Sequence, residues 1–263
     1  MPASDPPILL DPSLAPDTSL LITEDGKPVG SIFIEKQRRL LSEPLWTSWK
    51  HPAGKPFRVL ANVGLFYQIK SPAIVPDVML ALDVETPRSI REKNHCSYFM
   101  WIVGKPPDVA IQIVSDKYSG EDTEKLRTYQ HINVPYYVIF DPDNLLDGGV
   151  LRGFVLHGGT YRPVDPSNMD EIGLGLTLWR GRYENFEDTW LRWIELDGER
   201  VPTGKEFADA AKKSADESSI CTTLTDETQR ATESTKRAET AEERIRYLEK
   251  KMLDSGLSTN GAP

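Results

Sequence analysis

Short apolar segments bounded by Pro, Gly or Asp recur through the middle of the chain and predict four strands. They are Phe57–Asn62, Val78–Val84, Val109–Val114 and Tyr136–Phe140. Their β-branched and aromatic residues favour extended structure. A charged loop and a helix separate the last two segments, and apolar strands of this kind are typical of a sheet buried by helices. Polar groups are then expected where the strands end.

The flanking segments are less regular. Phe33–Leu41 is compatible with a short helix or a strand, and Arg91–Ile102 is expected to be a helix that turns into an extended edge. Towards the C-terminus the pattern predicts a hairpin with a Gly158-Gly159 turn, a second hairpin around Gly181, and a final strand. Their segments are Leu151–His157 with Thr160–Pro163, Leu174–Trp179 with Arg182–Tyr183, and Trp190–Glu195.

A different pattern begins after Thr203-Gly204. Residues 205–253 contain neither proline nor glycine, and apolar residues recur there at a seven-residue step: Leu224, Ala231, Ala238, Ile245 and Met252. Ala241 and Leu248 fill the companion position of the heptad, which Glu227 and Ser234 interrupt. This spacing predicts a long helix. Either a solvated single helix or a coiled coil that joins copies of the chain would produce it.

These patterns divide the chain into four parts. Residues 1–22, rich in Pro and Asp, are expected to be a flexible N-terminus, and residues 23–204 form the sheet domain. Residues 205–253 form a helical heptad tail, and residues 254–263 a disordered C-terminus.

Net charge, apolar runs and cysteine count limit the classes of protein to which the chain can belong. The net charge of −9 argues against a free-standing basic nucleic-acid binder, but an acidic nuclease can be basic along its groove alone. No apolar run approaches the ~20 residues that span a membrane, and the N-terminus lacks the features of a secretory signal. Two cysteines far apart in sequence favour a reducing cytoplasm.

Four polar residues stand out against the predicted strands. Asp77 precedes an apolar strand, and Gln112 is the polar side chain at the centre of another. Glu121 and Lys125 are four residues apart, so they face the same side of the predicted helix. Metal-dependent cleavage of a phosphodiester needs carboxylates that hold Mg²⁺ and a cation near the scissile phosphate.

At these residues the chain resembles the Uma-type restriction endonucleases of bacteria, which belong to the PD-(D/E)xK nuclease superfamily. The resemblance extends over roughly residues 40–253 and includes the Pro202–Gly204 junction and the heptads. Its matching stretches are Trp46–Trp49, Asn62–Tyr67, Val75–Val84, Tyr98–Tyr129, Val134–Pro142, Gly173–Trp179 and Asp188–Trp193.

The resemblance implies a role for each of the four residues. Asp77 would be the first metal carboxylate, and position 112, which is Glu in the family pattern, the second. The catalytic lysine would have moved to the helix as Lys125, with Glu121 as its acidic neighbour. Because Gln112 lacks the negative charge, we expect Mg²⁺ to be held weakly and cleavage to be impaired.

Each residue also has an ordinary structural interpretation. Asp77 after a proline is compatible with a turn or cap residue. Gln112 is compatible with a core amide that has hydrogen-bond partners, and Lys125 with a surface lysine paired with Glu121.

The expected fold is therefore an α/β restriction-endonuclease-like mixed sheet flanked by helices, with C-terminal β-hairpins and a coiled-coil-like helical tail. The expected function is Mg²⁺-dependent hydrolysis of DNA phosphodiesters, impaired at position 112. The alternative is a catalytically silent binding or scaffold protein that oligomerises through residues 205–253. Cleavage by the wild type and by Gln112→Glu separates the two.

Overall fold

A computed structural model describes residues 31–254 apart from residues 52, 69–70, 94 and 119. The expected flexible N-terminus and residues 255–263 lie outside the described part. The chain divides into two compact units, and the boundary between them lies between Val201 and Pro202. Each unit is treated separately below.

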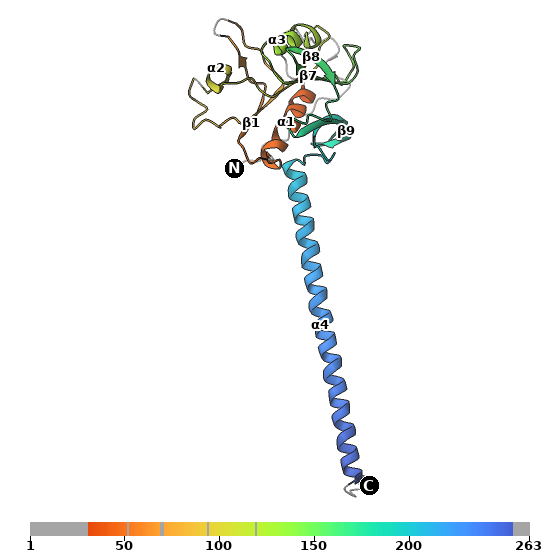
Figure 1. Ribbon diagram of the computed structural model, residues 1–263. Helices are drawn as coiled ribbons and strands as arrows, with labels where there is room; N and C mark the ends of the chain where they lie inside the picture. The colour runs from red at the N-terminus through yellow and green to blue at the C-terminus, as the bar shows by residue number, and fades with distance from the viewer. Residues whose placement is uncertain (1–30, 52, 69–70, 94, 119, 255–263) are drawn as a thin grey trace, which may run out of the picture. The chain divides into compact units, whose positions relative to one another are not determined.

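The first unit contains a six-stranded mixed sheet with the strand order β1-β3-β5-β6-β7-β8 (Figure 1). The four predicted strands are confirmed, with ends that differ by at most two residues. Within this sheet β5 and β6 pair in parallel, and the other neighbouring strands pair antiparallel. The strands are β1 Phe57–Ala61, β3 Val78–Leu82, β5 Val109–Ile113, β6 Tyr136–Phe140, β7 Leu151–His157 and β8 Thr160–Val164.

Every residue of β3, β5 and β6 is buried, because the sheet is covered on both faces. One face packs against α1 (Ile32–Thr47) and the hairpin of β9 (Leu174–Tyr183) and β10 (Phe186–Glu195). The other packs against α3 (Leu126–His131) and the short strands β2 (Leu65–Phe66) and β4 (Tyr98–Phe99). The expectation that helices bury the sheet is therefore correct only in part, since a hairpin supplies much of one cover.

The segment that was compatible with helix or strand is helix α1. The Ser31 hydroxyl accepts a hydrogen bond from the backbone N–H of Ile34 and so caps its first turn. Gln37 is fully buried and exchanges two 2.9 Å hydrogen bonds with the backbone of Leu191 in β10. An amide side chain thus fixes α1 to the hairpin.

The second hairpin differs from the prediction. β9 continues through Gly181, and the turn lies at Glu184-Asn185, which both adopt positive φ. The segment predicted as a separate final strand is the partner strand β10. A Cβ on Gly181 would lie 2.1 Å from the Trp179 ring, so glycine is required there by close packing and not by a turn.

The order expected within 91–102 is also wrong. The extended strand β4 comes first, and the helical turn α2 (Met100–Val103) follows it. Tyr98 is buried and its hydroxyl donates to the carbonyl of Lys105, which holds the extended residues against the domain.

The connection from β5 to β6 positions the polar residues. It contains a π-helical turn, Glu121–Lys125, which continues directly into α3. Gly120 precedes the turn with φ 76°, and the buried hydroxyl of Tyr137 in β6 donates to the Glu121 carbonyl at 2.8 Å. Strand β6 therefore holds the π-helical turn in position.

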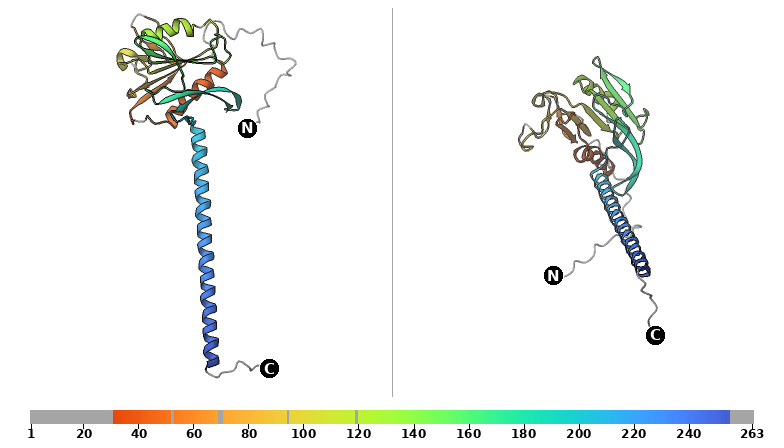
Figure 2. Two further views of the ribbon diagram at one scale, coloured as in Figure 1. Left: turned by 45° about the vertical axis from the view of Figure 1, so that its right-hand side comes forward. Right: turned by 60° about the horizontal axis from the view of Figure 1, so that its bottom comes forward.

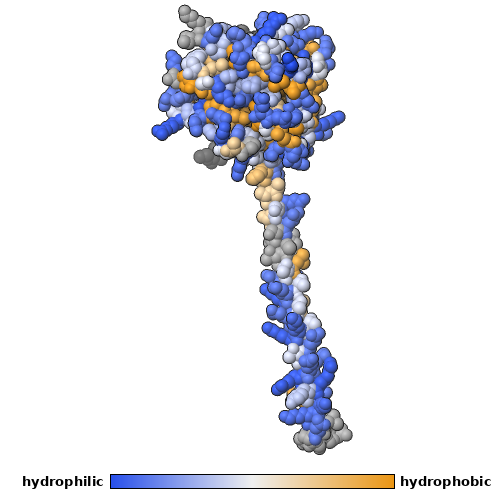
Figure 3. Space-filling model, viewed as in Figure 1, coloured by the Kyte–Doolittle hydropathy of each residue, from blue (hydrophilic) through white to orange (hydrophobic). Residues whose placement is uncertain are grey.

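The second unit contains helix α4 (Gly204–Asp254), seen without interruption in both views of Figure 2. Thr203 and Glu206 form a reciprocal capping box: the Glu206 carboxylate accepts from the Thr203 N–H at 2.7 Å, and the Thr203 hydroxyl accepts from the Glu206 N–H at 3.1 Å. Hydrophilic side chains cover most of α4 (Figure 3). Within the described residues, no helix combines the length and apolar character that crossing a membrane requires.

Candidate functional site

Asp77 lies immediately before β3, at the edge of the sheet where β5 ends. The antiparallel register pairs Val78 with Ile111, and continuing it by one residue places Asp77 opposite Gln112. The Asp77 side chain is buried, and its Oδ2 accepts a 2.8 Å hydrogen bond from the backbone N–H of Ile113. The carboxylate is therefore anchored to the strand that carries Gln112.

Arg38 of α1 is the partner that the sequence did not reveal. Its Nε donates to Asp77 Oδ1 at 2.8 Å, and its Nη2 donates to the same oxygen. The guanidinium is about one-fifth exposed and the carboxylate almost fully buried. Arg38 thus supplies the countercharge that a buried carboxylate requires.

Burial raises the pKa of Asp77 above its ordinary value, whereas the Ile113 N–H and the Arg38 and Lys125 cations oppose that rise. Burial and the neighbouring cations thus act on the pKa of Asp77 in opposite directions. The charge of Asp77 therefore depends on those cations.

Gln112 has a fixed amide orientation. Its Nε2 donates to the Val75 carbonyl at 3.1 Å and to the Tyr129 hydroxyl at 2.9 Å. Both donors are therefore used, and Oε1 faces Lys125, whose Nζ is 3.5 Å away. The Val75 carbonyl can only accept, so it selects the amide nitrogen and turns the oxygen towards the lysine.

Lys125 and Glu121 form the charged edge of the site. The Lys125 ammonium lies 2.9 Å from Glu121 Oε1, and the Glu121 side chain is 3% exposed whereas that of Lys125 is 30% exposed. The lysine is therefore held by a buried carboxylate and an amide oxygen while part of it stays accessible to water or a ligand.

Tyr129 and Tyr137 line the buried side of the site. Burial raises the pKa of each hydroxyl well above its ordinary value, and the charges of Glu121 and Asp77 raise it further. Both tyrosines therefore remain neutral, and the Tyr129 hydroxyl stays an acceptor for the Gln112 amide.

Arg152 is a second cation on the same face. Strand pairing places Gln112 beside Ile139, and Ile139 beside Arg152, in one row across the sheet. Arg152 Nη1 lies 3.6 Å from Asp122, while its Nε and Nη2 are buried without a hydrogen-bond partner in the described part of the protein. Arg152 therefore adds a positive charge to this face of the sheet.

The residue set partly fits a divalent metal. Asp77 and Gln112 offer carboxylate and amide oxygens, which are ligands that Mg²⁺ accepts. The charge is insufficient, however, because Arg38 and Lys125 already balance Asp77 and Glu121. Among the described residues, no group of three or more His, Cys, Asp or Glu side chains is arranged to hold a metal ion.

All four residues singled out in the sequence lie together at this edge of the sheet. Lys125 contacts both Glu121 and Gln112, and Asp77 lies across from Gln112 within range of the lysine charge. The structure adds Arg38 and Arg152, which come from α1 and β7. No periodicity or motif connects either arginine to the site in the sequence.

Comparison with known proteins identifies the family. No curated protein and no solved structure matches the chain. A family model described as "Putative restriction endonuclease", Uma2, matches residues 23–178, which is more than half of the chain. The match includes the six-stranded sheet and all of the residues discussed above, and it ends within β9. The chain therefore belongs to the Uma2 restriction endonuclease family.

Proposed function

We propose that the sheet domain hydrolyses DNA phosphodiesters in the cytoplasm as a Mg²⁺-dependent endonuclease, and that Gln112 weakens this activity. Family membership supports the reaction class. The observation that carries the proposal is the orientation of Gln112, whose oxygen faces Lys125 and lies opposite Asp77 while its nitrogen is held by Val75 and Tyr129. In this proposal the Gln112 oxygen would take the place of a carboxylate ligand without its charge.

Asp77 and Gln112 would hold the metal, which when bound supplies Lewis acidity to the phosphate and lowers the pKa of the attacking water. Arg38 keeps Asp77 ionised and fixed in orientation. Lys125 presents its ammonium to the water or to the phosphate oxygen on which negative charge develops. Arg152, whose side chain is 18% exposed, would add positive charge near a backbone phosphate.

A catalytically silent nucleic-acid-binding or scaffold protein is the second candidate. The balance of two carboxylates by two cations favours it, because such a site is stable without a metal. In this case the cations of the site would still bind phosphate, but the protein would not cleave the phosphodiester bond.

Cleavage of supercoiled plasmid and of a short duplex, with Mg²⁺ and with Mn²⁺, separates the two. We expect slow cleavage by the wild type, about tenfold or more acceleration by Gln112→Glu, and loss of cleavage when Asp77→Ala is added. Gln229→Glu, at an exposed position of α4, makes the same charge change outside the sheet domain and is the control.

Two results would contradict the proposed activity. Robust wild-type cleavage that survives Asp77→Ala would show that the metal carboxylate is assigned wrongly. Absence of cleavage by the wild type and by Gln112→Glu with either metal would favour the silent protein. DNA binding gives a separate readout, since Arg152→Gln should weaken binding of all sequences and reduce the salt slope by about one if Arg152 contacts a phosphate.

A further inference from the structure

Helix α4 exposes an apolar stripe to solvent. Ile245 is 55% exposed and lies at heptad position a, and Leu248 is 46% exposed and lies at position d. These two positions face the partner helix in a coiled coil. Leu224 and Met252 extend the a position to either side, and alanines fill the heptads between them. A second helix is the natural cover for a stripe this narrow.

The positions on either side of the stripe carry opposite charges. The g positions are all basic: Arg230, Arg237, Arg244 and Lys251. The e positions of the last two heptads are acidic, Glu242 and Glu249, whereas those of the earlier heptads are threonines. In a coiled coil, e and g residues contact the partner helix and set its identity and direction.

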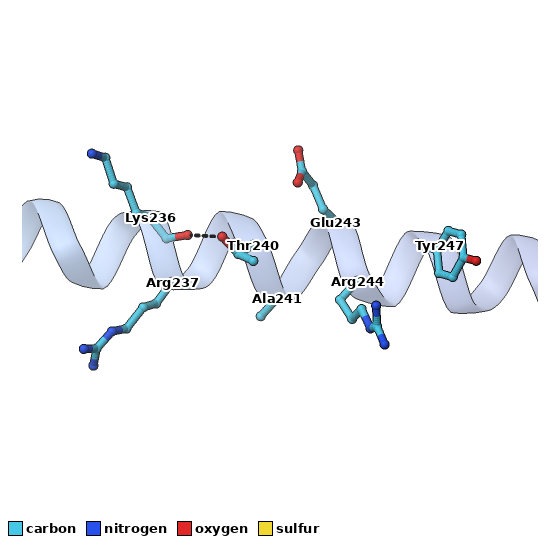
Figure 4. Close-up of a pocket in the computed structure, with 7 residues that line it drawn as sticks. All are labelled: Lys236, Arg237, Thr240, Ala241, Glu243, Arg244 and Tyr247. Atoms are coloured by element: carbon cyan, nitrogen blue, oxygen red, sulfur yellow. Dashed lines mark hydrogen bonds between the residues drawn. The ribbon is translucent and has the colours of Figure 1, made fainter.

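The close-up of α4 shows how these side chains are presented. Arg237, Ala241 and Arg244 lie on one side of the helix, away from Lys236 and Glu243 (Figure 4). The small Ala241 leaves a shallow depression between the two arginines. In the part of the chain that the structure describes, neither Arg237 nor Arg244 takes part in an ion pair. Both guanidinium groups are therefore available to a partner.

The charges distinguish between the two directions that a second copy could take. In a parallel, in-register pair, each g residue meets the e residue five positions later on the other helix. Arg237 then faces the partner's Glu242, and Arg244 faces the partner's Glu249. In an antiparallel pair g faces g, so that arginines would oppose arginines.

We propose that α4 docks along α4 of a second copy of this chain as a parallel, in-register two-stranded coiled coil over Ala231–Met252. Charge complementarity selects the parallel direction, and the apolar stripe supplies the contact. Ser234 and the alanines bury little area, so the association is weak and depends chiefly on Ile245 and Leu248. This inference is independent of the proposed nuclease function, since none of its residues lies in the sheet domain.

Charge reversal in the full chain tests the direction. Sedimentation velocity over a concentration series should show that the wild type dimerises and that Arg237→Glu with Arg244→Glu raises the dimer Kd roughly tenfold. Adding Glu242→Arg and Glu249→Arg should restore the wild-type Kd. Lys236→Glu with Lys250→Glu makes the same charge change at the outermost positions and should leave the Kd unchanged.

A cysteine at a d position gives a second readout. In a Cys96→Ser and Cys221→Ser background, Leu248→Cys should form a disulfide-linked dimer on mild oxidation, because an in-register parallel coil places the two copies of position 248 opposite each other. A cysteine at Lys250, on the outer face, should not crosslink.

Three results would overturn the inference. They are a wild-type chain that stays monomeric over the whole concentration series, a dimer that Arg237→Glu with Arg244→Glu strengthens, and a dimer in which Leu248→Cys fails to crosslink. The third would indicate the antiparallel arrangement, which separates the two copies of position 248.

Discussion

Two of the acid–base pairs that share the i,i+4 spacing lie in very different settings. Glu121 and Lys125 approach to 2.9 Å with the carboxylate 3% exposed, whereas Glu242 and Arg246 approach only to 3.4 Å and both are more than two-thirds exposed. The first pair lies over a buried sheet and contacts Gln112; the second is solvated on α4. Sequence spacing alone is therefore no guide to which pair has a structural or chemical role. Burial decides it.

The largest expected difference in unfolding free energy is between replacing Arg38, which pairs with the buried Asp77, and replacing Arg246 on α4. Arg38→Met should lower the free energy of unfolding of the sheet domain by about 3 kcal/mol at neutral pH, because it leaves the buried Asp77 carboxylate without its ion-pair partner. Arg246→Met on α4 should leave the same transition unchanged. Denaturant unfolding of both variants measures the difference.

The pH dependence of that loss has a definite sign. Without Arg38 the raised pKa of Asp77 rises further, so the folded state binds the proton more tightly than the unfolded state. The destabilisation by Arg38→Met is therefore present at neutral pH and disappears as the pH falls through the pKa of Asp77 in the folded protein. A loss that is the same at all pH values would show that Arg38 acts through packing alone.

The acid–base pairs themselves can be compared directly. Glu121→Gln should destabilise the sheet domain by about 1–2 kcal/mol, since it leaves Lys125 beside a buried neutral amide. Glu242→Gln should change the domain's stability by less than about 0.5 kcal/mol. Equal effects in thermal or denaturant unfolding would remove the distinction between the two pairs.

Gln112→Glu should lower the free energy of unfolding of the sheet domain by about 1 kcal/mol at neutral pH without metal. In Gln112→Glu a carboxylate oxygen replaces the amide nitrogen that donates to the Val75 carbonyl, and two acceptors then face each other. Burial and this contact raise the pKa of the new carboxyl group, so the cost decreases as the pH falls through that pKa. A variant as stable as the wild type at pH 7 without metal would contradict the fixed amide orientation.

The smallest effect is expected from removing the tail. Deletion of residues 205–263 should change the unfolding free energy of the sheet domain by less than about 0.5 kcal/mol, because the domain's two apolar clusters contain no residue from α4. It should also abolish dimerisation. A domain that no longer folds after the deletion would show that the two units are not independent.

The strands were predictable because each is a short apolar run with a turn residue at its end. Glu121 and Lys125 were predictable as neighbours because four residues make one helical turn. Arg38 was not, since it lies 39 residues from Asp77 in an ordinary amphipathic helix. Its pairing with Asp77 follows from how α1 packs on the sheet, and a single sequence carries no local signal of that packing.

The wrongly predicted turn and the unpredicted orientation of Gln112 also depend on contacts that form only in the folded protein. Gly181 suggested a turn, but it accommodates the Trp179 ring within β9, and the turn is made by Glu184 and Asn185 in the left-handed region. Glycine has both uses, and the sequence does not distinguish them. The orientation of Gln112 likewise depends on the Val75 carbonyl, a backbone atom that no sequence pattern places.

Mg²⁺ binding to the wild type and to Gln112→Glu, measured by calorimetric titration at neutral pH, tests the central claim most directly. In the proposed site, the uncharged Gln112 oxygen takes the place of a second carboxylate that would hold the metal with Asp77. We predict that Gln112→Glu binds Mg²⁺ about tenfold or more tightly than the wild type, and that adding Asp77→Ala removes the gain. Equal affinity of the wild type and Gln112→Glu, or a gain that persists without Asp77, would contradict the account.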